Sequence, residues 1–171
     1  VAITPDGQRL ALASPVPGSD DSDLYQVLVR RCTDWALVTD EPLRVRSGIK
    51  TMHWLVPACR HLMIGLEDGR VLAWDTQGAA GGESRDAEVV YRFTTECTRF
   101  AFDARGDWLA VSCQGDRDER IDAEACLFRR VGVPAAARFE SEFELHHVMR
   151  GVDPDLWRVA LVHDDHDRLI L

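Results

Sequence analysis

Acidic side chains are the residues of this sequence that gather most closely, and carboxylates can hold metal ions or attract cationic partners. Asp20, Asp21 and Asp23 share one short segment. Residues 114–124 hold five acids against two arginines, and 163-HDDHD-167 combines aspartate with histidine. If this chain does chemistry or recognises a charged partner through a local cluster, these three segments are the candidates.

The spacing of these residues does not match an established metal loop. The aspartates of residues 20–23 lack the alternating acids, the glycine and the distant glutamate of a calcium loop. The run 163–167, with His146 and His147 ahead of it, stays open as a metal or pH-sensitive contact beside its interpretation as a polar turn. The five cysteines show neither CxxC nor zinc-ligand spacing with histidine. We therefore predict no metal and no cofactor.

Motifs of catalysis are missing as well. There is no GxSxG, HExxH or P-loop, and the glycine-rich run 78–86 leads into a predicted strand, whereas phosphate binding needs a helix N-terminus. Widely spaced cysteines without a pairing pattern favour a reducing compartment, so we expect a cytoplasmic protein. We predict no catalytic residue, and therefore a protein that is not an enzyme.

Composition narrows the class of partner. The chain has 171 residues, of which 46% are hydrophobic, and this is enough for a substantial core. Its net charge of -9 argues against nucleic acid and anionic membrane surfaces as partners. Its uncharged apolar runs are far shorter than the ~20 residues that span a bilayer. We expect a globular protein with no nucleic-acid partner and no membrane partner.

The elements that must carry the acidic segments form a repeat. Four segments share one pattern, in which an apolar strand, a polar turn and a second apolar strand follow one another as in a β-hairpin. Their start residues give spacings of 52, 47 and 59 residues, which exceed the ~40–45 of a compact four-stranded blade, so loops take up the difference. The segments are 1-VAITPDGQRLAL-12, 53-HWLVPACRHLMI-64, 100-FAFDARGDWLAV-111 and 159-VALVHDDHDRLIL-171.

Two further strands are expected after each of the first three hairpins. They are 24–32 and 35–43, then 70–77 and 88–95, then 121–131 and 137–145. In the last strand Phe139, Phe143 and Leu145 alternate with three glutamates, which is typical of an outer, half-exposed strand. Trp35, Trp54 and Trp108 are expected to pack between blades. The blades are predicted to occupy 1–48, 49–96 and 97–148, and residues 149–171 to begin a fourth blade.

The stretch 65-GLEDGRVLAWDTQ-77 completes the pattern. Its Gly69 supplies positive φ to a tight turn, and Trp74-Asp75 closes the third strand. The sequence 52-MHWLVPACRHLMIGLEDGRVLAWD-75 resembles a WD40 repeat, and 1-VAITPDGQRLALAS-14 resembles its first half. The first and third segments carry Arg31-Cys32 and Arg129-Arg130 near the Trp-Asp position, and the family's Gly-His dipeptide is absent. Trp74 and Asp75 therefore have no obvious histidine partner.

The resemblance implies an all-β fold, a partial β-propeller of four-stranded antiparallel blades. Because propellers typically need ~4–8 blades to close, we expect the remaining blades from flanking sequence in a larger protein. The implied function is a non-catalytic protein-protein interaction scaffold or sensor module. Two alternatives stay open. One is a segment of an enzymatic propeller, lactonase-like or oxidoreductase-like, which would need acids and histidines at the starts of the inner strands, where only His53 lies. The other is an immunoglobulin-like sandwich, which fits the number of strands but not the repeat.

The resemblance also indicates where a partner would bind. In WD40-like blades the loops between second and third strands share a face with the connections between blades. The acidic loops 14–23 and 114–124 and the turn at Glu67 and Asp68 fall on that face, whereas the run 163–167 falls on the opposite face. The hypothesis is an acidic rim that attracts a protein or basic peptide segment, against the simpler interpretation as solvated loops. Trp157 is a candidate anchor. The candidate partner-binding residues are Asp20, Asp21, Asp23, Glu67, Asp68, Asp116, Asp118, Glu119 and Trp157.

Overall fold

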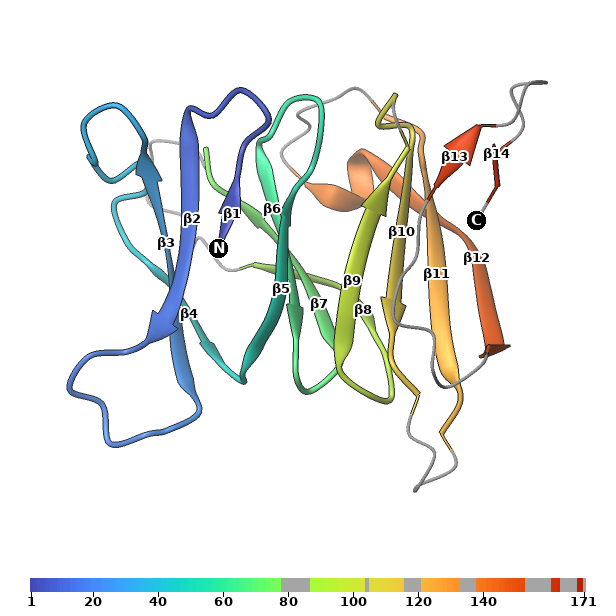
Figure 1. Cartoon of the computed structure of the whole chain (residues 1–171), viewed down its shortest axis with the longest axis horizontal. Helices are drawn as coiled ribbons and strands as arrows, with labels where there is room; N and C mark the ends of the chain where they lie inside the picture. Colours follow the sequence, from blue (N-terminus) through green and yellow to red (C-terminus); the bar gives the residue numbers. More distant parts are fainter. Residues whose placement is uncertain are drawn as a thin grey trace.

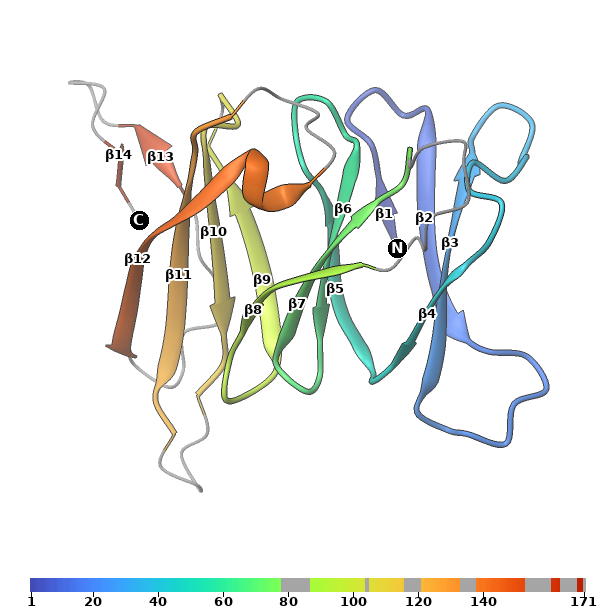
Figure 2. The same ribbon diagram turned by 180° about the vertical axis from the view of Figure 1, so that it is seen from behind.

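The computed structural model describes residues 1–77, 87–103, 105–115, 121–132, 138–152, 161–163 and 169–170. These residues form three four-stranded antiparallel sheets, here called blades one to three, and the short hairpin β13 (Val162–His163) and β14 (Leu169–Ile170) (Figure 1, Figure 2). Blade one holds β1 (Ala2–Ile3), β2 (Arg9–Pro15), β3 (Leu24–Arg31) and β4 (Leu43–Arg46). Blade two holds β5 (Ile49–Trp54), β6 (His61–Leu66), β7 (Arg70–Asp75) and β8 (Glu88–Arg92). Blade three holds β9 (Cys97–Phe102), β10 (Trp108–Cys113), β11 (Ala123–Arg130) and β12 (Phe143–Val152).

The four strands of each blade are hydrogen-bonded in sequence order, and the blades stand next to one another. The first strands β1, β5 and β9 contact one another from blade to blade, and each sheet extends from its first strand to its fourth (Figure 1). A sheet between two others is covered on both faces, so its strands need not alternate between apolar and polar residues. Strand β6 shows this, because all of its residues are buried. Among the described residues, no helix is long and apolar enough to cross a membrane.

The repeat expected from the sequence is present in the backbone pairing of the hairpins. In blade one Ala2 pairs with Ala11, and in blade three Ala101 pairs with Ala110. Each residue of the blade-three pair lies 99 residues after its counterpart in blade one, and 99 is also the spacing between the start residues 1 and 100 of the two sequence segments. The first and third hairpins therefore have the same register.

The hairpin turns show why these residues reverse the chain. In blade one the N–H of Gly7 (φ 69°) donates to the carbonyl of Thr4, and in blade three the N–H of Gly106 (φ 75°) donates to that of Asp103. Glycine adopts positive φ without the steric cost that a Cβ imposes. The turn of blade two contains one more residue, and Cys59 (φ 51°) is its positive-φ residue.

Apolar side chains between neighbouring blades form the core. Trp54 and Trp74, each 1% exposed, belong to the cluster between blades one and two. Met63 and Phe128 belong to the cluster between blades two and three. The packing role predicted for Trp54 is confirmed, whereas Trp108 is half-buried with its ring 5.1 Å from that of His146.

The strand predicted at residues 35–43 is wrong in position, because β4 begins only at Leu43. Asp34 accepts a hydrogen bond from the N–H of Ala36, and Trp35 between them has a φ of 60°. A side-chain turn of this kind competes with regular strand pairing. Trp35 is consequently 57% exposed, and its predicted packing role is wrong.

The alternation predicted for residues 137–145 is also wrong. The 3-10 turn η1 (Phe139–Ser141) interrupts the period of two before β12 begins. Leu145 is 47% exposed, whereas Glu142 is buried and forms an ion pair with the guanidinium of Arg130. A buried carboxylate needs such a partner, and no local pattern in the sequence indicates it.

Candidate functional site

Loops from blades one and two lie along one edge of the molecule, which we call the loop face. It contains the β2–β3 loop (16–23), the β6–β7 turn (67–69) and the connections between blades at 47–48 and 93–96 (Figure 1). The shared face expected from the resemblance is therefore present for these segments. Asp116, Asp118, Glu119 and Trp157 lie outside the described residues, as do residues 164–167 of the run 163–167.

The β2–β3 loop exposes three carboxylates. Asp20, Asp21 and Asp23 are all exposed, and the loop is shaped by hydrogen bonds from the N–H of Asp21 to Ser19 Oγ and from the N–H of Asp23 to Asp21 Oδ1. Arg46 Nε lies 3.8 Å from Asp21 Oδ2, and both side chains are well exposed. Exposed pairs of this kind contribute little, so the loop remains an acidic surface.

The β6–β7 turn of blade two is held more tightly. The N–H of Asp68 donates to Ser47 Oγ (3.2 Å), and Asp68 Oδ2 accepts from Arg70 Nε at 2.7 Å. Gly69 has a φ of 81°, as predicted, and a Cβ there would collide with the carbonyl oxygens of Phe93 and Thr95. The close approach of the two backbones explains why this turn requires glycine. Glu67 is thereby presented from a fixed turn.

Lys50, the only lysine of the chain, joins this turn to the connection between blades two and three. Its Nζ lies 2.8 Å from Glu67 Oε1 and 2.9 Å from Glu96 Oε2. Hydrogen bonds to Glu67 and then Glu96 raise the pKa of Lys50 from its ordinary value of 10.5 to about 12. The ammonium is therefore fully charged at neutral pH and neutralises one of the two carboxylate charges.

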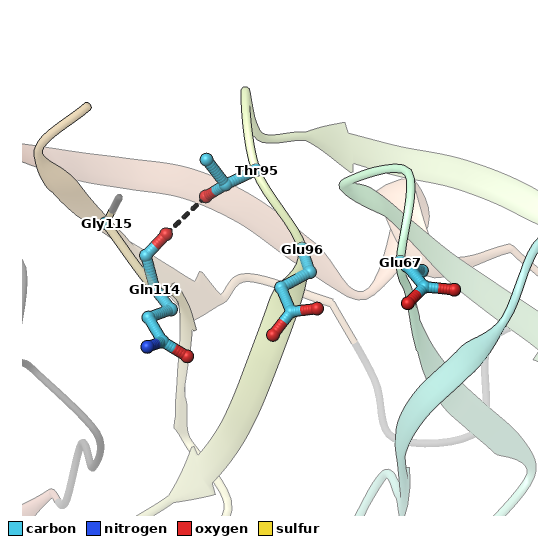
Figure 3. A pocket seen from close by; sticks show the side chains of 5 residues that line it. All are labelled: Glu67, Thr95, Glu96, Gln114 and Gly115. Atoms are coloured by element: carbon cyan, nitrogen blue, oxygen red, sulfur yellow. Dashed lines mark hydrogen bonds between the residues drawn. The ribbon is translucent and has the colours of Figure 1, made fainter. Parts of the chain in front are cut away.

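A pocket of about 350 Å³ opens beside this ion pair. Its lining residues are Glu67, Thr95, Glu96, Gln114 and Gly115, which come from blade two, the connection 93–96 and the end of β10 (Figure 3). The Thr95 hydroxyl donates a hydrogen bond to the backbone carbonyl of Gln114, so the two walls are tied together. Two carboxylates and an amide oxygen make this pocket rich in acceptors, and such a lining suits an ammonium or guanidinium group.

Sequence reasoning found only part of this site. The structure places Glu67 in the pocket and Asp68 beside it, and it places the three aspartates of the β2–β3 loop on the same face. Lys50, Glu96 and Gln114 were missed. That Lys50 is the chain's only lysine was a signal, but nothing in the sequence shows that its two partners come from different connections.

The Trp74-Asp75 pair lies away from the loop face, at the end of β7. Asp75 accepts hydrogen bonds from Arg60, at 3.0 Å between Oδ1 and Nε and 2.6 Å between Oδ2 and Nη2, so its charged partner is an arginine. Burial acts to raise the pKa of Asp75, but the hydrogen bond from Arg60 and the N–H of Gln77 outweigh it, and the pKa is lowered. Trp74 is buried, and its indole N–H has no partner among the described residues. The pair has a structural role in this chain.

No group of three or more histidine, cysteine, aspartate or glutamate side chains in the described part of the chain is arranged to hold a metal ion. The cysteines at 32, 59, 97, 113 and 126 are free thiols. Burial raises the pKa of Cys97 and Cys126 well above the ordinary value, so both thiols stay protonated. Such thiols are poor nucleophiles and act as core residues.

Comparison with known proteins supports the fold. No family model and no curated protein matches the sequence. Hsv2 of Kluyveromyces lactis aligns over 86% of this chain and 46% of its own, with 15% identity and a TM-score of 0.51. Hydrazine synthase of Kuenenia stuttgartiensis aligns over 97% of this chain and 52% of its own, with 14% identity and a TM-score of 0.55.

The chain thus spans about half the length of these structures, and at this identity the likeness shows the fold alone. It agrees with the three four-stranded sheets and with the predicted fold class. The chain is an all-β partial β-propeller, similar in structure to WD40-like β-propellers over most of its length.

Proposed function

We propose that this chain is part of a divergent WD40-repeat propeller, with about three blades and the first hairpin of a fourth. It acts as a non-catalytic scaffold or sensor module in the cytoplasm, and the remaining blades come from flanking sequence. Its loop face binds a basic segment of a partner protein. No bond is made or broken in this role, because recognition rests on charge and shape.

The observation that carries the proposal is the pocket beside Lys50. Glu67 and Glu96 already bind one ammonium group at 2.8 and 2.9 Å, which supports the view that their carboxylates suit a cation. Lys50 supplies one positive charge against their two negative charges, so a lysine or arginine from a partner still meets a net negative site. The exposed aspartates of the β2–β3 loop extend the acidic surface along the same edge.

The test is the binding of a fluorescent arginine-rich peptide to the whole chain, followed by anisotropy at low salt. Replacing Glu67 and Glu96 by glutamine removes two charges but keeps the side-chain shapes. We expect the dissociation constant to rise about tenfold, since an exposed charge pair contributes up to about 1 kcal/mol. Further change of Asp20, Asp21 and Asp23 to asparagine should weaken binding again.

The matched control is the pair Asp107→Asn and Glu144→Gln. Both acids are exposed and lie near the edge opposite the loop face, in the β9–β10 turn and at the start of β12. Their replacement makes the net charge less negative by the same amount, so binding should change by less than about twofold if the site is local. Equal weakening by the two pairs would show attraction by net charge alone and would reject the loop-face site.

A further inference from the structure

A second pocket, of about 390 Å³, lies in blade one at the edge opposite the loop face. Its lining residues come from the β1–β2 turn, the start of β2, the end of β3 and the connection that follows β3 (Figure 1). They are Gln8, Arg9, Arg31, Leu37 and Val38, and we call this site the arginine pocket. Guanidinium groups offer only donors. The lining is therefore opposite in character to the acceptor-rich pocket beside Lys50.

The two arginines of this pocket are held close together by the sheet. Arg9 and Arg31 are directly opposite partners in the β2–β3 pairing. Opposite side chains share one face of a sheet with Cβ atoms about 5 Å apart, and two like charges in such a pair destabilise it. Asp34 Oδ1 lies 3.3 Å from Arg31 Nε and offsets part of this repulsion. A bound anion that both guanidiniums contact would relieve the rest.

Arg9 is fixed in orientation by blade two. Its Cζ lies over the ring of Trp54, 5.0 Å from the centroid. A guanidinium that stacks on an aromatic face keeps its N–H groups in its own plane, where they can donate to a carboxylate. The backbone around it is also tied, because the N–H of Cys32 donates to the carbonyl of Gln8 at 2.9 Å. The donors of Arg9 therefore need little reordering on binding, which favours affinity.

Trp35 adds an exposed aromatic surface to the connection that lines this pocket. Its φ of 60° is rare for a bulky residue, and it is 57% exposed, so core packing does not account for a tryptophan here. Arg30 Nη1 donates to the carbonyl of Trp35 at 2.6 Å, and the N–H of Trp35 donates to the carbonyl of Arg31 at 3.0 Å. These bonds hold the strained conformation in place. Tryptophan and arginine are also the residues that most often anchor interfaces.

Charge decides which kind of anion suits the pocket. Residues 6–9 and 30–38 contain three arginines and two aspartates, so one positive charge remains. A carboxylate carries a single negative charge and matches the planar guanidinium. A phosphate group carries close to two negative charges at neutral pH and would meet the two aspartates as well. The balance therefore favours a carboxylate.

We infer that the arginine pocket binds a segment of a partner protein in which an acidic residue stands next to an apolar one. The carboxylate of this segment accepts hydrogen bonds from Arg9 and Arg31. Its apolar side chain lies against Leu37, Val38 and Trp35. The inference does not depend on the loop-face proposal, because the site lies at the opposite edge and takes a segment of opposite charge.

The test is the binding of a dye-labelled peptide, in which glutamate alternates with leucine, to the whole chain at low salt, followed by anisotropy. Arg31→Gln removes one guanidinium from a side chain that is 53% exposed, so the urea midpoint should change little. We expect this change to raise the dissociation constant severalfold. Arg9→Gln combined with Arg31→Gln should raise it by about tenfold or more, because both charge-assisted bonds are lost. No binding by the wild type, or unchanged binding by the double variant, would overturn the inference.

The matched control is Arg44→Gln combined with Arg46→Gln. Both arginines are exposed on β4 of the same blade, and their replacement removes the same charge. Binding of the acidic peptide should therefore change by less than about twofold if the arginine pocket is the site. Equal weakening by the two pairs would show attraction by net charge alone and would overturn the inference.

Trp35→Asn separates binding from folding. Asparagine adopts positive φ more readily than tryptophan, so the urea midpoint should not fall. The dissociation constant of the acidic peptide should still rise severalfold, because the aromatic surface is lost. Unchanged peptide binding would mean that the pocket takes a small anion alone, and a peptide segment as occupant would be wrong.

Competition identifies the anion. Acetate and inorganic phosphate are added at equal ionic strength to the complex of the chain with the acidic peptide. Phosphate should displace the peptide no better than acetate does, because the pocket has one net positive charge to offer. Clearly stronger displacement by phosphate would overturn the assignment to a carboxylate.

Discussion

Replacing Lys50 by methionine removes the ammonium group that joins Glu67 to Glu96, and its effect on stability should depend on pH. The pKa of Lys50 rises from 10.5 to about 12 on folding, which corresponds to roughly 2 kcal/mol if the charges are unscreened. The side chain is 36% exposed, so solvent screening reduces this contribution to about 1 kcal/mol or less. The sign follows from the raised pKa, because the folded protein binds this proton more tightly than the unfolded chain does. The stabilisation is therefore complete below pH 10.5 and is lost as pH rises to about 12.

Urea unfolding of wild type and Lys50→Met between neutral pH and about pH 12 measures this contribution, because no other lysine titrates. The difference in unfolding free energy between the two proteins should shrink toward zero at the upper end. Lys50→Arg is the control, since arginine keeps its charge across this range and should retain most of the stabilisation. A difference that is the same at both ends would mean that Lys50 acts through packing, and the electrostatic account of the pocket would fail.

Three further changes test the packing. Arg130→Met should lower the free energy of urea unfolding by about 3–5 kcal/mol, because the buried carboxylate of Glu142 loses its guanidinium partner and keeps only His61, whose Nδ1 lies 3.9 Å from Oε2. Arg130→Met combined with Glu142→Leu should recover most of the loss, and no recovery would contradict a charge effect. Gly69→Ala should lower the free energy of unfolding by well over 1 kcal/mol, because the new Cβ collides with backbone carbonyls. Gly7→Ala is the control, since Gly7 has a similar φ but a Cβ there would have nothing within 4 Å, and it should cost only about 1 kcal/mol. Equal losses of stability would rule out the backbone collision. Leu62→Ala should lower the free energy of urea unfolding by about 2–5 kcal/mol. Leu145→Ala should lower it much less, because only Leu62 is buried.

Local patterns in the sequence were sufficient for the fold class and for the hairpins. Alternation of apolar strands and polar turns is set by neighbouring residues, so the register of blades one and three and the positive φ of Gly69 could be predicted. Glycine at such a turn reports a local steric requirement. These features need no knowledge of what packs against the blade.

The candidate site depended on contacts between blades, whereas the errors came from a contact within blade three and from a local turn. The turn of Glu67 and the connection of Glu96 meet at Lys50 only because blades two and three pack side by side. Glu142 looked like an exposed residue of an alternating strand, yet Arg130 from the neighbouring strand makes its burial possible. Trp35 looked buried because it is large and apolar, but a local turn directs it to the surface.

The sequence by itself determined strands, turns and repeat, because these follow from side-chain periodicity and backbone sterics within about ten residues. Only the tertiary structure decided which face of each strand is covered and which charges meet. Those outcomes depend on tertiary packing, so the partners of Lys50 and Glu142 could be identified only in the folded protein.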